Sequence, residues 1–167
     1  MPSLIILGVD PGIVRTGYGV ISVGDEDIPS VVTFGHISTN TKNDLAQRLH
    51  SLYQQLEIII HETRPDVLSI ESIFYADNVR TAIVMGHARG AAIVAGMNNQ
   101  TRISEYSPRE IKQSVVGNGA ASKSQVRYMV ARLLNYKEPI QPDDASDALA
   151  VALCHWHRLK FKQLQTV

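Results

Sequence analysis

The chain alternates between short apolar runs and longer segments in which apolar residues recur every three or four positions. Apolar runs cover residues 4–9, 17–23 and 31–37, and turn-forming residues separate them. Runs of this length are typical of β-strands, and short connections between consecutive strands favour antiparallel pairing. Two further compact runs, at residues 66–71 and 102–106, predict a fourth and a fifth strand.

The first two helices are predicted from spacing and composition. Asn43 or Asp44 can cap a helix whose apolar positions recur at helical spacing as far as Ile60, and this helix should end before Pro65. An Ala/Gly-rich run at residues 78–97 is best interpreted as a second helix. Its small residues allow another backbone to approach closely.

Three more helices are predicted in the second half of the chain. Two capping boxes, which begin at Ser107 and Ser122, open the third and the fourth. A last helix begins near Asp143 or Asp144 and is expected to end at about Leu159.

This order of elements predicts one α/β domain. Three antiparallel strands, followed by strands reached through helical crossovers, give a mixed five-stranded sheet with helices on its faces. The 167 residues suffice for one domain, which we expect to have its core at residues 3–160 and a C-terminal tail at residues 161–167.

Composition narrows the class of protein. Hydrophobic residues make up 44% of the chain and charged residues 19%, which is typical of a globular protein. The single cysteine, Cys154, excludes an internal disulfide framework and a zinc ribbon. No signal-peptide pattern and no apolar stretch of ~18 residues is found, so a soluble cytoplasmic protein is expected, with no membrane partner.

The net charge is zero, but charge is unevenly distributed. Residues 1–101 carry six Lys/Arg and ten Asp/Glu, whereas residues 102–136 carry six Lys/Arg and two Glu. A basic segment beside acidic ones fits a polyanion held next to a metal-binding carboxylate cluster. Taken alone, such a segment also fits a solvated helix face.

Four carboxylates lie at positions where they could bind a metal ion and take part in catalysis. Asp10 ends the first predicted strand, Glu71 ends the fourth, and Asp144 and Asp147 lie one turn apart at the start of the last helix. Each has an ordinary explanation as a turn residue or as a helix-dipole partner. If all four converge, their repulsion requires a cation, and oxygen-only ligands favour Mg²⁺, with Mn²⁺ able to substitute. Two such ions can support phosphodiester hydrolysis.

Five motifs, in order and at compatible spacing over nearly the whole chain, resemble the RuvC family of bacterial Holliday-junction resolvases. They are Leu-Gly-Val-Asp-Pro-Gly with Thr-Gly-Tyr-Gly-Val at residues 7–20, Ile-Glu-Ser-Ile-Phe at 70–74, Lys-Gln-Ser-Val-Val-Gly at 112–117, Lys-Ser-Gln-Val at 123–126 and Asp-Ala-Ser-Asp-Ala-Leu-Ala at 144–150.

The resemblance implies a ribonuclease H-like fold and a homodimer. It implies Mg²⁺-dependent, symmetric nicking of two opposed strands of a four-way DNA junction, in homologous recombination and DNA repair. The products would be 5′-phosphate and 3′-hydroxyl ends, and the partner a RuvA–RuvB branch-migration complex.

The resemblance also assigns residues. Asp10, Glu71, Asp144 and Asp147 fall on the family's four acidic catalytic positions, and we expect them to bind the metal. Asp143 lies beside the motif; Asp144 is preferred as the ligand because the Asp-x-x-Asp-Ala-Leu pattern then aligns.

DNA contacts are expected at four other positions. Lys112 and Lys123 fall on family positions implicated in DNA handling, and both lie near helix N-termini, which favour anions. Phe74 follows Glu71 and is expected to stack on an unpaired base. Arg80 is a candidate phosphate contact.

Three rival functions are weighed against this one. An ATPase of the actin or sugar-kinase type has a similar N-terminal sequence. That class needs two such domains around the nucleotide, and this chain has the length of one and no Walker-type phosphate loop. The paired lysine motifs and Phe74 argue against an RNA-processing nuclease of the same fold. A catalytically inactive junction-binding or scaffold protein would not need four intact acids.

Two further expectations concern the helices. Residues 78–97 are a candidate dimer interface, with Ala88 and Ala92 as exposed positions to test; burial of this helix in its own core is the alternative. His155 and His157 are interpreted as cationic residues near a helix C-terminus, and Cys154 as a small buried hydrophobe.

Overall fold

A five-stranded mixed sheet forms the centre of the protein. The computed structural model describes residues 3–72 and 78–165. The strands are β1 (Leu4–Asp10), β2 (Arg15–Val23), β3 (Pro29–Ser38), β4 (Val67–Glu71) and β5 (Arg102–Tyr106), in the order β3-β2-β1-β4-β5. β1 to β3 pair antiparallel, and β4 joins β1 and β5 in parallel. The predicted sheet and element order are therefore confirmed.

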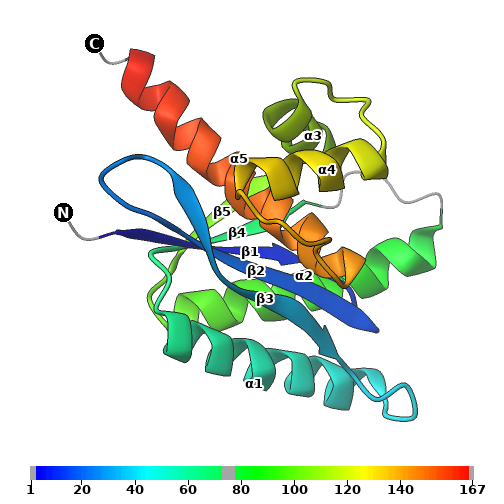
Figure 1. Ribbon diagram of the computed structural model, residues 1–167. Coiled ribbons are helices and arrows are strands. Elements are labelled where there is room, and N and C mark those ends of the chain that lie inside the picture. Colours follow the sequence, from blue (N-terminus) through cyan, green and yellow to red (C-terminus); the bar gives the residue numbers. More distant parts are fainter. Residues whose placement is uncertain (1–2, 73–77, 166–167) are drawn as a thin grey trace.

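The helices cover both faces of the sheet. α1 (Leu45–Thr63) and α2 (Val79–Asn98) pack side by side on one face, and α5 (Asp143–Gln165) crosses the other over β1 and β2. α3 (Pro108–Val116) and α4 (Lys123–Leu133) lie against α5 (Figure 1). No helix in the described ranges is long and apolar enough to cross a bilayer.

Helix starts follow from capping chemistry. Asp44, rather than Asn43, caps α1: its side chain accepts a hydrogen bond from the backbone N–H of Gln47, and the Gln47 side chain accepts one from the Asp44 backbone. Ser107 and Ser122 form the same reciprocal arrangement at α3 and α4. Each box satisfies N–H groups that have no partner within the helix.

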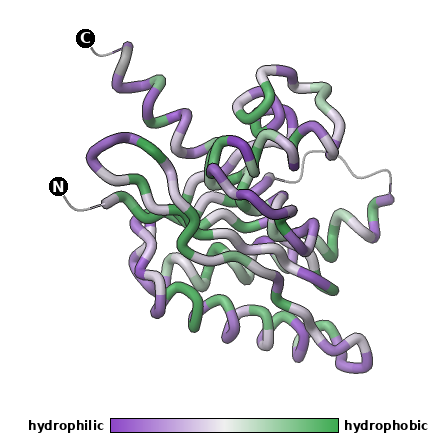
Figure 2. The backbone as a smooth tube through the Cα atoms, viewed as in Figure 1, coloured by the Kyte–Doolittle hydropathy of each residue, from purple (hydrophilic) through white to green (hydrophobic). Residues whose placement is uncertain are grey.

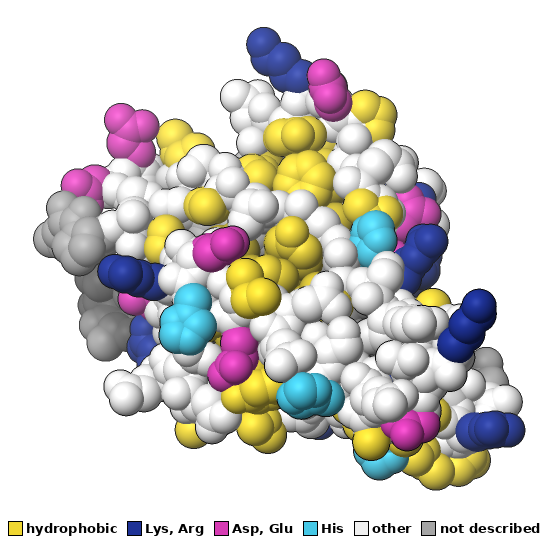
Figure 3. Space-filling view, turned by 90° about the horizontal axis from the view of Figure 1, so that it is seen from below, with side chains coloured by type: hydrophobic (Ala, Val, Ile, Leu, Met, Phe, Trp, Pro, Cys, Tyr) yellow, Lys and Arg dark blue, Asp and Glu magenta, His cyan; other side chains and the backbone are white. Residues whose placement is uncertain are grey.

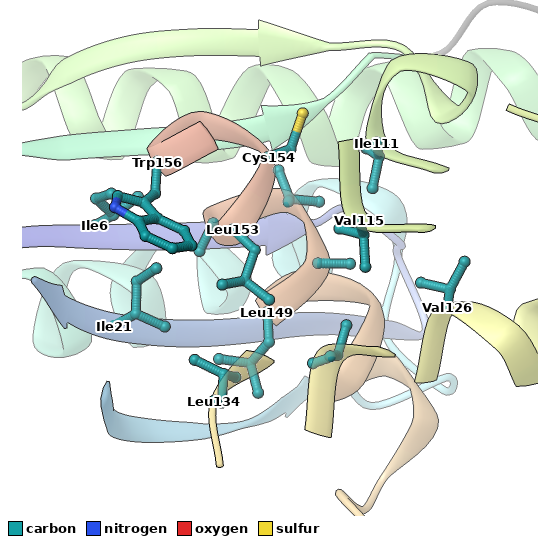
Figure 4. Close-up of a cluster of buried hydrophobic side chains, with 14 of the residues drawn as sticks. Ile6, Ile21, Ile111, Val115, Val126, Leu134, Leu149, Leu153, Cys154 and Trp156 are labelled. Atoms are coloured by element: carbon teal, nitrogen blue, oxygen red, sulfur yellow. The ribbon is translucent and has the colours of Figure 1, made fainter. Parts of the chain in front are cut away.

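The sheet separates two hydrophobic layers. Ile6 of β1 and Ile21 of β2 face α5, where Leu149, Leu153 and Trp156 pack on them (Figure 4). Successive strand residues point to opposite faces, so the neighbouring Leu7 and Val20 belong to the layer under α1 and α2. Figure 2 shows the complementary pattern, with mainly hydrophilic residues at the C-terminal end of α5 and in the loop between β3 and α1.

α5 is longer than predicted. It ends at Gln165 rather than at about Leu159, so residues 161–165 are helical and not a tail. His155 therefore lies in mid-helix, 5% exposed, and burial lowers its pKa to about 4. The interpretation of His155 as a cation at a helix C-terminus was wrong. Cys154 is fully buried, as predicted, and burial raises its pKa to about 11.

The small residues of α2 divide between two faces. Ala88 and Ala92 are fully buried in the hydrophobic layer that α1, α2 and the sheet share, so treating them as exposed positions was wrong. Gly86 and Gly90 lie on the opposite side, where an added Cβ would meet nothing within 4 Å. Helical spacing puts them in one stripe with four exposed apolar side chains: Val79, Ile83, Val94 and Met97.

Candidate active site

Two carboxylates meet where neighbouring parallel strands end. β1 pairs with β4 in a register that sets Val9 opposite Ile70, so Asp10 and Glu71 follow at the same edge of the sheet. The two side chains are hydrogen-bonded to each other. This interaction contributes to the raised pKa of Asp10 and places the two carboxyl groups close together.

Glycines of β1 and β2 let α5 lie directly on the sheet. A Cβ at Gly17 would fall 1.9 Å from the carbonyl oxygen of Asp144, and a Cβ at Gly8 would fall 2.0 Å from that of Ala148. Only glycine, which has no Cβ, allows this close approach at positions 8 and 17. The first turn of α5 therefore carries Asp144 and Asp147 to the sheet edge where Asp10 lies.

The four carboxylates line one cavity of about 450 Å³. Three basic side chains line it as well: Arg15 from β2, Lys112 from α3 and Lys123 from α4. The cavity thus has acids contributed by β1, β4 and α5 and cations from three other elements. Such a site can hold a cation together with an anionic group.

Burial sets the protonation of the acids. The pKa of Asp10 is raised to about 8, mainly because burial removes water from the carboxylate, and further because Glu71, Asp147 and Asp144 are negative. Burial also raises the pKa of Glu71 and that of Asp147. The site therefore has an excess of negative charge for a nearly buried environment, which a bound cation would relieve.

The lysines moderate this charge. Lys123 Nζ lies 3.7 Å from Asp147 Oδ2, and its own side chain is 76% exposed. The positive charges of Lys123 and Lys112 lower the pKa of Glu71, against the larger effect of burial. Both lysines are thus placed to meet a second anion as well as the acids.

The donor set fits a hard divalent cation. Four carboxylates supply only oxygen ligands, which Mg²⁺ and Mn²⁺ prefer. Within residues 3–72 and 78–165, no three acidic, histidine or cysteine side chains converge on one ion position. Asp10 instead interacts with Glu71, and Asp147 is paired with Lys123, so a bound cation would replace these contacts.

The other predicted residues are placed as follows. Asp143 does not line the cavity; its Oδ2 lies 2.6 Å from Arg127 Nη2, an arrangement that favours Asp144 as the inward acid. Arg80 is exposed in the first turn of α2, outside the cavity lining. Phe74 lies outside the described residues.

Sequence reasoning missed Arg15 and Met85. Both line the cavity, Arg15 from the first residue of β2 and Met85 from α2. The position of Arg15, five residues after Asp10 on a returning hairpin, was a usable signal. Nothing in the spacing of α2 pointed to Met85.

The chain is similar to known proteins over most of its length. The family model for crossover junction endodeoxyribonuclease RuvC matches residues 6–155. The protein of that name from Alkaliphilus oremlandii is 44% identical over 161 residues, covering 96% of this chain and 98% of the relative. The one from Caldanaerobacter subterraneus is 46% identical over 152 residues, covering 91% of this chain and 92% of the relative.

Solved structures are also similar. Thermus thermophilus RuvC in complex with a Holliday junction substrate superposes with a TM-score of 0.90 at 28% identity, covering 95% of this chain and 96% of the other. The yeast mitochondrial Holliday junction resolvase Ydc2 has a TM-score of 0.64 at 14% identity, covering 96% of this chain and 83% of the other, and shares the fold.

The fold and the acidic cavity define a nuclease of the ribonuclease H-like class. Within that class, the chain belongs to the RuvC family of crossover junction endodeoxyribonucleases. Nucleases of this family are metal-dependent.

Proposed function

We propose that the protein resolves four-way DNA junctions by Mg²⁺-dependent nicking of two opposed strands, in homologous recombination and DNA repair. The observation that carries this is the single cavity in which Asp10, Glu71, Asp144 and Asp147 meet Lys112 and Lys123. Family membership adds the junction as the substrate, because the relatives are named for crossover junctions.

The four acids are the proposed metal ligands, for two ions per site. When bound, Mg²⁺ would supply Lewis-acid stabilisation of the phosphodiester and activation of water. Asp10 and Glu71, held by adjacent strands, fix one side of the site, and Asp144 and Asp147 fix the other. The products would be 5′-phosphate and 3′-hydroxyl ends.

The basic residues are the proposed DNA contacts. Lys112 and Lys123 line the cavity and bind phosphates next to the cut, and Arg15 is added to them because it lines the same cavity. Arg80, exposed in the first turn of α2, is kept as a more distant phosphate contact. Stacking of Phe74 on an unpaired base remains a prediction.

A homodimer supplies the second nick. Two symmetric cuts need two sites in matching orientation, and the described part of one chain holds one such set of acids. The proposed interface is the α2 stripe, defined as Val79, Ile83, Gly86, Gly90, Val94 and Met97. Figure 3 shows the side of the molecule on which α1 and α2 lie, with hydrophobic side chains exposed among charged ones. Glycines in such a stripe let two helices approach closely.

The RuvA–RuvB complex as a partner and a cytoplasmic location both remain predictions of this function.

The test is cleavage of matched substrates. A synthetic four-way junction, a linear duplex and a single strand of the same sequence are incubated with the protein, with and without Mg²⁺. We expect cutting of the junction alone, and only with the metal. Equal cutting of the duplex would contradict the proposal. In parallel assays, preferential cutting of RNA or hydrolysis of a nucleotide without DNA would contradict it as well.

A further inference from the structure

The turn between β1 and β2 joins an acid of the cavity to a cation of the same cavity. Asp10 ends β1, and Arg15 begins β2. Both line the cavity, together with Pro11 and Gly12 of the turn. The path of the backbone through residues 11–14 therefore determines where the Asp10 carboxylate and the Arg15 guanidinium lie relative to each other.

A buried hydroxyl closes this turn from within. The Thr16 side chain is fully buried, and its Oγ1 donates a hydrogen bond to the carbonyl oxygen of Gly12 at 2.6 Å. The same oxygen accepts one from the backbone N–H of Gly12 at 3.2 Å. A Cβ at Gly12 would fall 2.3 Å from the carbonyl oxygen of Arg15, so the turn is tight. These contacts fix the shape of the turn, but they do not attach it to the rest of the protein.

The attachment comes from two side chains outside the turn. The carbonyl oxygen of Ile13 accepts a hydrogen bond from Thr39 Oγ1 at 2.5 Å and another from Arg48 Nη2 at 3.1 Å. Arg48 Nε also donates to Thr39 Oγ1, at 3.0 Å. The backbone N–H of Thr39 donates to the carbonyl oxygen of Val14 at 3.2 Å. Ile13, Thr39 and Arg48 thus form a closed triangle of hydrogen bonds, which we call the Ile13 clamp.

The clamp connects the turn to α1, on the face of the sheet opposite α5. Thr39 follows the last residue of β3, and Arg48 lies in the first turn of α1, whose start is fixed by the capping box at Asp44. Thr39 is 8% exposed, and Arg48 is half-buried. A hydrogen bond from a guanidinium is charge-assisted and stronger than one between neutral groups. The position of α1 therefore constrains the position of the turn.

Neither Thr39 nor Arg48 lines the cavity, so any effect of the two on the reaction passes through the turn. We propose that Arg48 and Thr39 are positioning residues for phosphodiester hydrolysis, which hold the Ile13 carbonyl so that Asp10 and Arg15 keep their places in the cavity. This inference rests on the proposed function and deepens it. Site residues must be held within about 0.5 Å of the productive geometry, and a shift of ~1 Å can cost ~100-fold in rate.

The test uses substitutions with matched controls. Thr39→Val removes the hydroxyl at nearly constant shape, whereas Thr39→Ser keeps it. Arg48→Met removes both donors, whereas Arg48→Lys keeps one donor. Lys42→Met removes an exposed charge from the same β3–α1 connection. Three quantities are measured well below the unfolding midpoint of every variant: single-turnover cleavage of a four-way junction with Mg²⁺ at saturating protein, junction binding without metal, and Mn²⁺ binding to the protein alone by calorimetry.

Thr39→Val and Arg48→Met should each lower the single-turnover rate and the Mn²⁺ affinity by about tenfold, the low end of the ~10- to 100-fold that groups supporting metal ligands contribute. Junction binding without metal should stay at the wild-type level. Thr39→Ser and Lys42→Met should resemble wild type. Arg48→Lys should fall between wild type and Arg48→Met, because an ammonium group can still donate but lacks the planar fork. The double variant should be no worse than the more damaged single one, because both side chains act on one carbonyl.

Wild-type cleavage and Mn²⁺ affinity in folded Thr39→Val and Arg48→Met would overturn the clamp, and would leave these bonds a role in stability alone. Weaker junction binding with an unchanged rate at saturation would also overturn it, because Arg48 would then contact DNA directly. A wild type that does not cut the junction would contradict the proposed function. The Mn²⁺ titration would still decide whether the clamp positions the acids, because that measurement needs no DNA.

Discussion

Asp144 and Asp143 are adjacent in sequence but occupy different environments. Asp144 lines the acidic cavity, whereas Asp143 is paired with Arg127. We expect Asp144→Asn to lower the rate of junction cleavage more than about a hundredfold, because even residues that only support metal ligands contribute ~10- to 100-fold. Asp143→Asn should retain most of the activity.

The same comparison applies to the other acids. Asp10→Asn, Glu71→Gln and Asp147→Asn should each abolish cleavage while junction binding survives, measured by gel shift and by single-turnover cutting. A reversed order, with Asp143→Asn the more damaging change, would show that the first turn of α5 presents the wrong acid in our assignment.

Burial of His155 makes stability depend on pH. Its Nδ1 lies 2.7 Å from the hydroxyl of Tyr106, and its pKa is lowered from 6.5 to about 4, first by burial. The unfolded chain therefore takes up a proton on His155 before the folded protein does. This contribution to stability is present above pH 6.5 and is lost as pH falls towards 4, by roughly 3 kcal/mol at ~1.36 kcal/mol per pKa unit.

Denaturant unfolding at several pH values checks this prediction. The free energy of unfolding of the wild type should fall more steeply between pH 6.5 and 4 than that of His155→Phe, which cannot titrate. Parallel curves for the two proteins would mean that His155 is as easily protonated in the folded state as in the unfolded one.

The residues that line the cavity could be predicted only where residue type and position coincide. The strand-end acids Asp10 and Glu71 were found because a charged residue directly after a buried strand is unusual. Arg15 was missed, since an arginine at the start of a strand has many ordinary explanations. His155 was misjudged because its burial depends on how far α5 continues, which spacing alone did not settle.

At the scale of elements, the contact between α5 and the sheet decides whether the four acids line the same cavity. Gly17→Ala would place a methyl group 1.9 Å from the Asp144 carbonyl oxygen and push the first turn of α5 outward. We expect a loss of stability of about 1–3 kcal/mol and a larger loss of cleavage than of junction binding. Thermal unfolding and single-turnover cleavage measure the two effects.

Gly24→Ala is the matched control, because a Cβ there would meet nothing within 4 Å. It should leave both stability and cleavage close to wild type. Wild-type activity in Gly17→Ala would mean that α5 can shift without separating the acids, and that its close approach is not needed for the site.

Most elements could be predicted because their boundaries are local. Capping boxes at Ser107 and Ser122 and the strand pattern each depend on a few neighbouring residues, and all were confirmed. The end of α5 was not, since no capping residue marks it; the absence of Gly and Pro after Leu159 was the available signal. The direct contact of α5 with Gly8 and Gly17 joins segments over a hundred residues apart, which spacing cannot reveal.

At the scale of the whole molecule, the α2 stripe should form the dimer. Gly86→Glu and Gly90→Glu add a charge where the single chain has open space, so the fold should survive while the dimer dissociates. Sedimentation velocity at micromolar concentration measures this, with Gln54→Glu on the exposed side of α1 as the control. Dimers that persist in both glycine variants would place the interface elsewhere.

Paired cleavage of one junction tests the central claim most directly. The four strands of a junction are labelled separately, and the nicked strands are identified after a single binding event with Mg²⁺. The account predicts nicks at matching positions in two opposed strands, with 5′-phosphate ends that a ligase can seal. Nicks in adjacent strands, or at unrelated positions in all four, would contradict resolution by a symmetric pair of these acidic sites.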